Sequence, residues 1–393
     1  MIPNFSFTPF PQIYFGKGEF LKLADKLAGK SKKILVLIGG SSLKKSGKLD
    51  DFTLSLNKHS INYFCEVVAS EPSPELVDEI AIKCKVEEVD TVLAVGGGSV
   101  LDAGKAIAAM APLDDGIINY LEGVGTKSHP GDTLSFIAVP TTAGTGSEAT
   151  KNAVISSIGE NGFKKSLRHD NFIPDCAVID PELMLSCPKA LTAACGLDNI
   201  TQLLESYVSS KANPISDALA FGALEKAIPA FPKVMKNGES DLEARADMAY
   251  GAFVSGITLA NAGLGIVHGF ASPIGGFFDI PHGVVCGTLL PAATEQNVKR
   301  LQEQSDTIHL ERLNKHIKVA RIFSESKDMT DEEALQNLVA RFYEWTKEFK
   351  VPRLSQYGIK ESDLDRIIAA SGLKNNPVNL SEFDLKEILY KRL

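Results

Sequence analysis

The feature that most constrains the fold of this chain is a series of short apolar runs in its first half, each stopped by glycine or proline. Lys33–Ile38, Thr91–Val95 and Leu134–Val139 are three such runs. Glu75–Glu88 and Ser99–Met110 lie between them and carry apolar residues at helical spacing. Near-continuous apolar strands that alternate with helices are typical of a parallel sheet covered on both faces. The first half therefore predicts an α/β domain.

The second half has no comparable strand signals. Two domains suit a chain of 393 residues, and we place an α/β domain at 1–186 and an all-helical domain at 187–393, around a shared cleft. The uncharged stretch Gly251–Phe270 holds five glycines, which favours a buried core helix ending at a glycine-rich break over a membrane span. The spacing predicts helices at Lys189–Ser209, Pro214–Val234, Leu242–Asn261, Glu311–Ser324, Asp331–Glu348 and Ser381–Leu389.

Composition excludes several classes of partner. The 41 basic and 49 acidic residues give a net charge of −8, which argues against a nucleic-acid or anionic-membrane surface. The six cysteines form no CxxC pair, and the N-terminus lacks the basic and apolar regions of a secretory signal. We therefore expect a cytoplasmic protein with reduced thiols. The segment Asn4–Phe15, with a short strand at Ile13–Phe15, is expected to be an edge strand that pairs across a homodimer.

A glycine-rich loop follows the run Thr91–Val95. Gly96, Gly97 and Gly98 lead directly into the helix that begins at Ser99. Glycines let backbone N–H groups approach an anion, and a helix N-terminus favours negative charge. The loop matches neither of the two standard phosphate-binding fingerprints. A phosphate site and a tight turn without a ligand both remain open at this point.

Two further loops favour a nucleotide site. Pro140–Glu148 follows a buried run and carries three threonines, one serine and two glycines, all suited to donate to a pyrophosphate. Gly39–Ser42 follows another run, and no carboxylate occurs until Asp50. NAD sites usually place an acidic residue there to bind the ribose 2′-hydroxyl. The sequence therefore favours NADP(H), with NAD(H) possible and a solvated turn as the alternative.

Polar residues in the helical half suggest a metal site. His268 and His282 are each followed by glycine in apolar surroundings, whereas His309 and His316 are expected on a solvated helix face. Asp198 shares one helix face with Gln202 and Glu205. One aspartate and two histidines form a ligand set for Fe(II), or for Zn(II) with an open position. A helix cap or an Asp–His pair would explain the same residues.

Together these motifs resemble the iron-containing (group III) alcohol dehydrogenase family over nearly the full chain. The resemblance implies an N-terminal Rossmann-like dinucleotide-binding domain and an all-α C-terminal domain, the dehydroquinate synthase-like architecture, with the metal in the cleft between them. The matching segments are PQIYFGKG at the start, GGGSVLDAGKA at 96–106, PTTAGTGSEAT at 140–150, IPDCAVIDPEL at 173–183, GLDNITQLLESY at 196–207, GLGIVHGFASPIGGFFDIPHG at 263–283 and NNP at 375–377.

The resemblance also implies roles for single residues. Asn152 and Leu259 would border the substrate, and Gly40 stands where NAD-preferring members carry an aspartate. The implied metal ligands are Asp198, Gln202, His268 and His282. In the loop after the first run, Gly40, Ser41 and Ser42 are expected to contact the cofactor. The further cofactor contacts that the resemblance implies are Gly97, Gly98, Ser99, Asp102, Thr141, Thr142, Thr145 and Lys165, or its neighbour Lys164.

Two positions depart from the family pattern. Gln202 stands where the family usually has a fourth ligand histidine, and Ser272 stands where it often has a second histidine that relays protons. We expect an NADP(H)-preferring enzyme that uses Fe2+ or Zn2+ to interconvert a small aldehyde and a primary alcohol. Asp198, His268, His282 and Ser272 would be its catalytic residues. The alternatives are a metal-free carbonyl reductase and a decayed nucleotide-binding protein, with a dehydroquinate synthase-like reaction less favoured.

Overall fold

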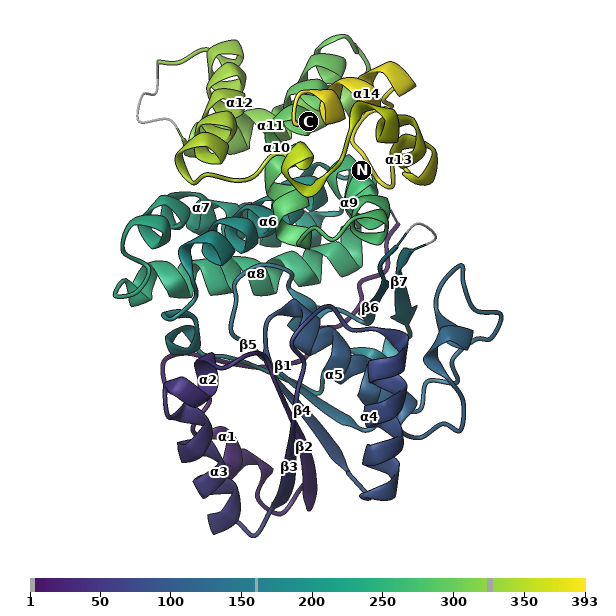
Figure 1. Cartoon of the computed structure of the whole chain (residues 1–393). Helices are drawn as coiled ribbons and strands as arrows, with labels where there is room; N and C mark the ends of the chain where they lie inside the picture. The colour runs from purple at the N-terminus through teal and green to yellow at the C-terminus, as the bar shows by residue number, and fades with distance from the viewer. Residues whose placement is uncertain (1–3, 160–161, 324–327) are drawn as a thin grey trace.

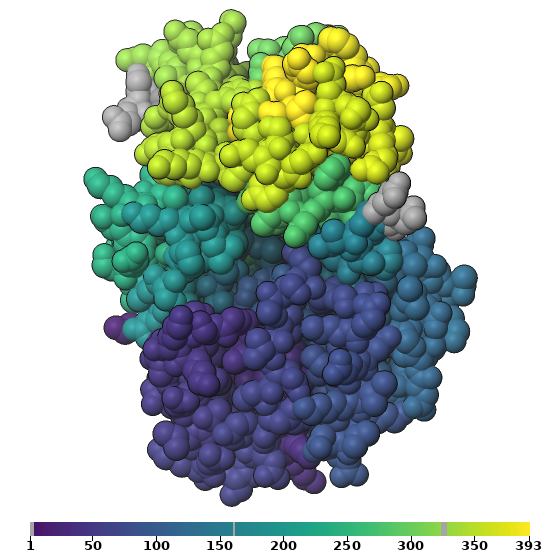
Figure 2. Space-filling view, viewed as in Figure 1, coloured from purple at the N-terminus to yellow at the C-terminus, as the bar shows by residue number. Residues whose placement is uncertain are grey.

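The computed structural model describes residues 4–159, 162–323 and 328–393. Figure 1 shows two stacked parts, a sheet with helices on both faces and a bundle of helices above one end of it. The space-filling view in Figure 2 shows a recess between the two parts. The expected combination of a Rossmann-like α/β domain and an all-helical domain is therefore confirmed.

All strands of the main sheet are parallel, and most of their residues are buried. The order of the strands changes direction between β2 and β4, which is the place where open α/β sheets bind ligands. Across the sheet the strands are β1 (Gln12–Phe15), β8 (Cys176–Ile179), β5 (Ser135–Pro140), β4 (Thr91–Gly96), β2 (Lys33–Ile38) and β3 (Asn62–Val67).

Helices cover both faces of this sheet because its central strands are apolar on both sides. Leu35 and Leu37 of β2 pack in one cluster with helices α4 and α5, whereas Ile34 and Val36 pack in the other with α1 and α3. The helices of this domain are α1 (Leu23–Leu27), α2 (Ser42–Lys45), α3 (Lys48–Lys58), α4 (Pro74–Val86) and α5 (Gly98–Met110).

An antiparallel hairpin and several short 3-10 helices complete the α/β part. The hairpin consists of β6 (Asn152–Ser157) and β7 (Phe163–Arg168). The 3-10 helices of the whole chain are η1 (Ile117–Tyr120), η2 (Ser147–Ala149), η3 (Asp170–Phe172), η4 (Pro181–Met184), η5 (Leu354–Tyr357) and η6 (Glu361–Asp363).

The helical part contains two apolar clusters, one centred on α6 to α8 and one on α9, α10 and the C-terminal helices. No single helix within the described residues is long and apolar enough to span a membrane; α8 and α9 pass that test only as a pair, bent by 99°. The helices are α6 (Lys189–Val208), α7 (Pro214–Asn237), α8 (Leu242–Ala262), α9 (Ile266–Phe277), α10 (His282–Gln302), α11 (Thr307–Ile322), α12 (Asp331–Glu348), α13 (Leu364–Ala370) and α14 (Glu382–Tyr390).

The two parts touch through backbone contacts that require glycine. A Cβ atom on Gly146, which follows β5, would lie 2.5 Å from the backbone nitrogen of Gly256 in α8. Gly146 also has φ of +63°, which suits glycine best. The predicted boundary at residue 186 falls in the short connection between η4 and α6.

Some sequence-based expectations were wrong in detail. The strands β3 and β8 and the hairpin β6–β7 were not predicted, because β3 alternates between exposed and half-buried residues and β8 has only four residues. His282 is the first residue of α10 and follows Pro281 at the N-cap. Gly251–Phe270 contains the end of α8 and the start of α9. The predicted end of one helix at Ser324 lies outside the described residues.

Candidate metal and cofactor site

The face of α6 that carries Asp198, Gln202 and Glu205 is buried. Asp198 is only 1% exposed. Its Oδ1 atom has no hydrogen-bond partner among the described residues. A buried carboxylate oxygen without a partner is costly, so this atom calls for a cation or a protonated imidazole.

His268 and His282 bring imidazole nitrogens to the same oxygen from two other helices. His268 Nε2 on α9 lies 3.3 Å from Asp198 Oδ1. His282 Nε2 on α10 lies 3.8 Å from it. The tight packing of α10 against α6 depends on Gly283, where a Cβ atom would lie 2.7 Å from the carbonyl oxygen of Ala194. Residues that are distant in sequence thus converge on one point.

Cys286 joins this cluster. Its Sγ atom lies 3.6 Å from Nε2 of His268 and 3.6 Å from Nε2 of His282. One ligand atom from each of Asp198, His268, His282 and Cys286 lies within 4.8 Å of the others. The set of oxygen, nitrogen and sulfur donors, together with the unpartnered Oδ1, fits a divalent transition metal.

Glu205 orients His268. Glu205 Oε2 lies 2.7 Å from His268 Nδ1, and its Oε1 accepts a hydrogen bond of 2.7 Å from the backbone N–H of Val267. Because the carboxylate is placed to accept a hydrogen bond from Nδ1–H, Nε2 is the ring nitrogen that faces the cluster and would bind a metal once it has lost its proton. This carboxylate–histidine pair is the usual support behind a metal-bound imidazole. Sequence reasoning had placed Glu205 on the right face of the helix but had assigned it no role.

The buried groups shift one another's protonation strongly. Burial would raise the pKa of Asp198, but the two histidines outweigh it and lower the pKa to about 2. Burial lowers the pKa of His282 to about 4, despite the attraction of Asp198. The pKa of His268 is raised well above its ordinary value, because Cys286, Asp198 and Glu205 together overcome the effect of burial. Burial and Asp198 raise the pKa of the Cys286 thiol to about 12.

Gln202, the predicted fourth ligand, lies next to the cluster but is engaged elsewhere. Its amide nitrogen donates to Asp198 Oδ2 at 3.3 Å. Its amide oxygen accepts a hydrogen bond of 3.0 Å from the hydroxyl of Ser255. The oxygen through which Gln202 was expected to bind a metal is thus occupied by a protein donor. The structure instead places the sulfur of Cys286, which sequence reasoning missed, among the donor atoms.

The three predicted cofactor loops meet at the carboxyl edge of the sheet. Ile38 pairs with Val95, and Gly96 pairs with Pro140, so the segments after β2, β4 and β5 are neighbours. A Cβ atom on Gly98 would lie 2.7 Å from Thr145 Oγ1, and one on Gly97 would lie 3.4 Å from Thr142 Oγ1. The loops after β4 and β5 therefore contact each other. No side chain among the described residues caps the N-terminus of α5, which leaves its N–H groups available to an anion.

The remaining predicted cofactor residues occupy the same edge. Ser41 is the N-cap residue of α2 and Ser42 its first residue, Ser99 lies in the first turn of α5, and the Thr141 N–H donates to the carbonyl oxygen of Gly96 at 2.8 Å. Gly40 has φ of +44°, and a Cβ atom there would meet nothing within 4 Å.

The carboxylate of Asp102 is hydrogen-bonded to other residues of the α/β part. It accepts hydrogen bonds from the hydroxyl of Ser147 and, at 3.1 Å, from the backbone N–H of Val154. One turn further along α5, the buried ammonium of Lys105 donates to the carbonyl oxygens of Ser147 and Asn152 at 2.8 and 2.9 Å. The two side chains hold the loop after β5 and the start of β6 against α5.

The other predicted residues lie around the interface of the two parts. Lys164 is nearly buried and pairs with Glu71 at 3.0 Å, whereas Lys165 is exposed with its Nζ beside Gly123. Leu259, near the end of α8, is half-buried. The side chain of Asn152, at the start of β6, donates to Ser166 at 3.4 Å. Ser272 is exposed, one turn after His268 on α9.

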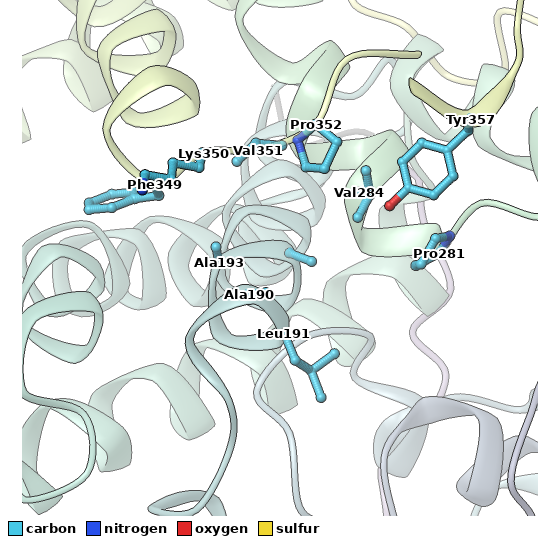
Figure 3. Close-up of a pocket in the computed structure, with 11 residues that line it drawn as sticks. Ala190, Leu191, Ala193, Pro281, Val284, Phe349, Lys350, Val351, Pro352 and Tyr357 are labelled. Carbon is cyan, nitrogen blue, oxygen red and sulfur yellow. The ribbon is translucent and has the colours of Figure 1, made fainter. Parts of the chain in front are cut away.

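A cavity of about 300 Å³ opens elsewhere on the helical part (Figure 3). Its walls are mostly apolar and include Leu191 at the start of α6, Pro281 and Val284 at the start of α10, and Tyr357. None of the four metal-donor residues lines it. The cavity therefore lies beside the start of α10, and it is separate from the donor cluster.

A sheet edge of the dinucleotide-binding type, combined with a cluster of possible metal donors in the helical part, is typical of metal-assisted, nicotinamide-dependent oxidoreductases. The comparison with known families agrees. The model described as "Iron-containing alcohol dehydrogenase" matches residues 11–181, and the one described as "Fe-containing alcohol dehydrogenase family, C-terminal" matches residues 192–393. The chain belongs to the iron-containing alcohol dehydrogenase family, whose members use NAD(P) and a metal.

Several characterised proteins are similar over nearly their whole length. Long-chain-alcohol dehydrogenase 1 of Geobacillus thermodenitrificans is 33% identical over 96% of this chain and 94% of its own. NADPH-dependent butanol dehydrogenase of Clostridium saccharobutylicum is 31% identical over 97% and 96%. The solved structure of alcohol dehydrogenase from Oenococcus oeni superposes with a TM-score of 0.88 at 28% identity, covering 99% of this chain and all of its own. The chain is therefore an alcohol dehydrogenase.

Proposed function

We propose that this protein is an NADP(H)-preferring, metal-assisted alcohol dehydrogenase that reduces small aldehydes to primary alcohols. One observation carries the proposal. The unpartnered Oδ1 of buried Asp198 and the Nε2 atoms of His268 and His282 face a single point between α6, α9 and α10. Such a point is where a metal would be held beside the cofactor edge of the sheet.

Asp198, His268 and His282 would hold Fe2+ or Zn2+. When bound, the metal supplies Lewis acidity, which polarises a carbonyl group and stabilises negative charge on its oxygen. The chain's own contribution is to orient the donors. Glu205 fixes the Nδ1 proton of His268, and Gln202 holds the second oxygen of Asp198 through its amide N–H. The surrounding apolar cluster of α9 and α10 keeps bulk water from this side of the site.

The loops after β2, β4 and β5 would hold the cofactor. The nicotinamide ring supplies the hydride, and the protein supplies binding and orientation. The uncapped N-terminus of α5 would bind the pyrophosphate, with Thr142 and Thr145 as hydroxyl donors beside it. The open space at Gly40, with Lys44 and Lys45 close by in α2, favours a 2′-phosphate. The similarity to an NADPH-dependent butanol dehydrogenase is consistent with this preference.

The substrate would lie between the two parts, bordered by Asn152 and Leu259. The half-buried position of Leu259 favours a small, apolar chain on the aldehyde. Reduction also needs a proton on the product oxygen. Ser272, exposed one turn after His268, would pass this proton from water through its hydroxyl group. A serine, unlike a histidine, does not take up a proton and become charged. A proton relay through Ser272 would therefore depend more on water molecules than a relay through a histidine does.

The decisive experiment is anaerobic NADPH oxidation with a panel of short aldehydes, on protein stripped of metal and then resupplied with Fe(II) or Zn(II). Turnover that returns only with metal, and more strongly with NADPH than NADH, is the expected result. Turnover that never depends on metal would replace this proposal with a metal-free carbonyl reductase. Tight NADPH binding without turnover of any aldehyde would indicate a nucleotide-binding protein that has lost its activity.

We also propose that the protein is a cytoplasmic homodimer. The strand β1 lies at the edge of the main sheet, and its residues Ile13 and Phe15 are exposed. An exposed edge strand offers unpaired backbone groups to a second copy. Sedimentation of the purified protein tests this; a monomer at micromolar concentration would contradict it.

A further inference from the structure

The donor cluster contains a thiol at a position that faces both histidines. Cys286 follows His282 by four residues on α10, so the two side chains share one face of that helix. Cys286 is fully buried, and its Sγ is 3.6 Å from each imidazole Nε2. No other cysteine within the described residues belongs to a cluster of possible metal donors.

Three of the distances between donor atoms match the spacing of ligands around one tetrahedral ion, whereas the distance from Asp198 Oδ1 to His282 Nε2 is 3.8 Å, about 0.5 Å longer than that spacing. Metal–sulfur bonds of about 2.3 Å and metal–nitrogen bonds of about 2.0–2.1 Å, at tetrahedral angles, place nitrogen and sulfur about 3.5–3.6 Å apart. The same bond lengths place nitrogen and a carboxylate oxygen about 3.3 Å apart. The Cys286–His268 and Cys286–His282 distances match the first value, and the Asp198–His268 distance of 3.3 Å matches the second.

The side chain of Gln202 has a different role. It lies one turn after Asp198 on α6 and is buried. Its amide nitrogen contacts Asp198 Oδ2, and its amide oxygen is taken by Ser255, whose hydroxyl also contacts the carbonyl oxygen of Ala252 within α8. An amide that contacts Asp198 at one end and Ser255 at the other positions the carboxylate, and its oxygen already accepts a hydrogen bond from a protein hydroxyl.

We propose that Cys286, and not Gln202, is the fourth protein ligand of the metal. The inference rests on the proposed metal-assisted function and specifies its donor set as Asp198, His268, His282 and Cys286. On metal binding the Cys286 thiol would lose its proton, which would pass to solvent, and the resulting thiolate sulfur would bind the metal. Compared with the family pattern, in which a histidine at the position of Gln202 is the fourth ligand, the fourth ligand would come from α10 instead of α6. A soft thiolate ligand favours Zn(II) over Fe(II) at this site.

The test uses Co(II), whose thiolate complexes absorb strongly in the near ultraviolet. Full-length protein is stripped of metal, loaded with one equivalent of Co(II), and its absorption spectrum is compared with that of the Cys286→Ala variant. The wild type should show a sulfur-to-cobalt charge-transfer band, and Cys286→Ala should lose it. Cys286→Ala should also bind Co(II) roughly 100-fold or more weakly in competition with a chelator, since even loss of an outer-shell partner costs 10–100-fold.

Cys84→Ala is the matched control, because Cys84 is equally buried in a helix of the α/β part. It should keep both the band and the affinity. Cys286→Ser preserves the side-chain volume and should lose the band in the same way, which covers the case that the alanine variant fails to fold.

Three results would overturn the inference. The first is a charge-transfer band that persists in Cys286→Ala and Cys286→Ser. The second is a wild-type protein that binds one Co(II) and reduces aldehydes without any such band, which would leave the proposed function intact. Wild-type protein that binds no Co(II) would overturn both the inference and the metal-assisted function.

Discussion

The cofactor edge and the metal-donor cluster are built in opposite ways. Each loop of the cofactor edge is a short continuous segment directly after a strand, and the parallel register brings the three loops together. The donor cluster takes one residue from α6, one from α9 and two from α10, spread over positions 198–286. The first site is thus specified locally, whereas the second depends on how helices pack.

This difference determines what each site tolerates. The cofactor loops lie at an open edge, where Gly40 has space around it. Asp198, His268 and Cys286 are buried and His282 is half-buried, and each contacts another polar group of the cluster. Changes at the cofactor edge should therefore alter specificity, whereas changes in the helical part should alter the integrity of the site.

The largest effect is expected at the centre of the donor cluster. Asp198→Ala removes the one carboxylate that faces both histidines, and kcat/KM for aldehyde reduction should fall by about 1,000-fold or more. Steady-state kinetics with metal analysis measures this. Asp247→Ala, on α8 and outside the cluster, should behave like wild type. An Asp198→Ala enzyme that keeps its metal and its turnover would show that the cluster is not the reaction centre.

The second largest effect is expected for a buried histidine in the helical part, which should make the fold less stable in acid. His316 on α11 is 1% exposed, and burial lowers its pKa to about 4. Because the folded pKa lies below the unfolded value of about 6.5, this neutral histidine stabilises the fold above pH 6.5 and loses that contribution as the pH falls toward 4. At pH 5 the loss is about 2 kcal/mol relative to pH 7.5.

Chemical denaturation of wild type and His316→Gln at both pH values measures this contribution, and the variant should lose about 2 kcal/mol less on acidification. Asn314→Gln, an exposed position on the same helix without an ionisable side chain, is the control and should behave like wild type. Equal pH dependence in His316→Gln and wild type would contradict the prediction.

The packing of α10 on α6 predicts a smaller change. In Gly283→Ala the new methyl group would lie 2.7 Å from the carbonyl oxygen of Ala194, so we expect about 1–3 kcal/mol of destabilisation. Gly222→Ala on α7 meets nothing within 4 Å and should stabilise its helix by up to about 1 kcal/mol. Thermal denaturation of the two variants compares them directly. Identical melting temperatures would mean that α10 can shift without cost.

The smallest effect is expected at the cofactor edge. Gly40→Asp places a carboxylate beside the proposed 2′-phosphate, and kcat/KM with NADPH should fall about tenfold, or about 1.4 kcal/mol, while that with NADH is unchanged. Gly29→Asp is the control, because Gly29 also has a positive φ and open space but precedes β2 at the opposite edge of the sheet. A NADPH-to-NADH ratio that does not change in Gly40→Asp would place the adenosine ribose elsewhere.

The same contrast explains what the sequence could predict. β2, β4 and β5 were found because each is a buried apolar run ended by glycine or proline. β3 was missed because it is an edge strand whose residues alternate in exposure. Short sequence patterns are therefore sufficient to predict those strands that consist of one continuous apolar run.

In the helical part, sequence patterns identified candidates but not their contacts. Asp198, His268 and His282 were singled out as polar residues in apolar surroundings, and they do converge. Cys286 was overlooked because a buried cysteine resembles any small apolar residue; its spacing of four from His282 was the available signal. His316, expected in solvent because its neighbours are charged, is buried since α11 turns that face toward the core.

The position of β1 at the sheet edge also has a consequence for synthesis on the ribosome. Gln12 pairs with Cys176, about 160 residues later in the chain. At about 5–20 residues per second, the first strand to be made therefore waits roughly 10–30 s for its partner. During translation the order β2, β4, β5 can assemble first, and β1 joins only after β8 has emerged. The strand that begins the domain is thus the last to enter its sheet.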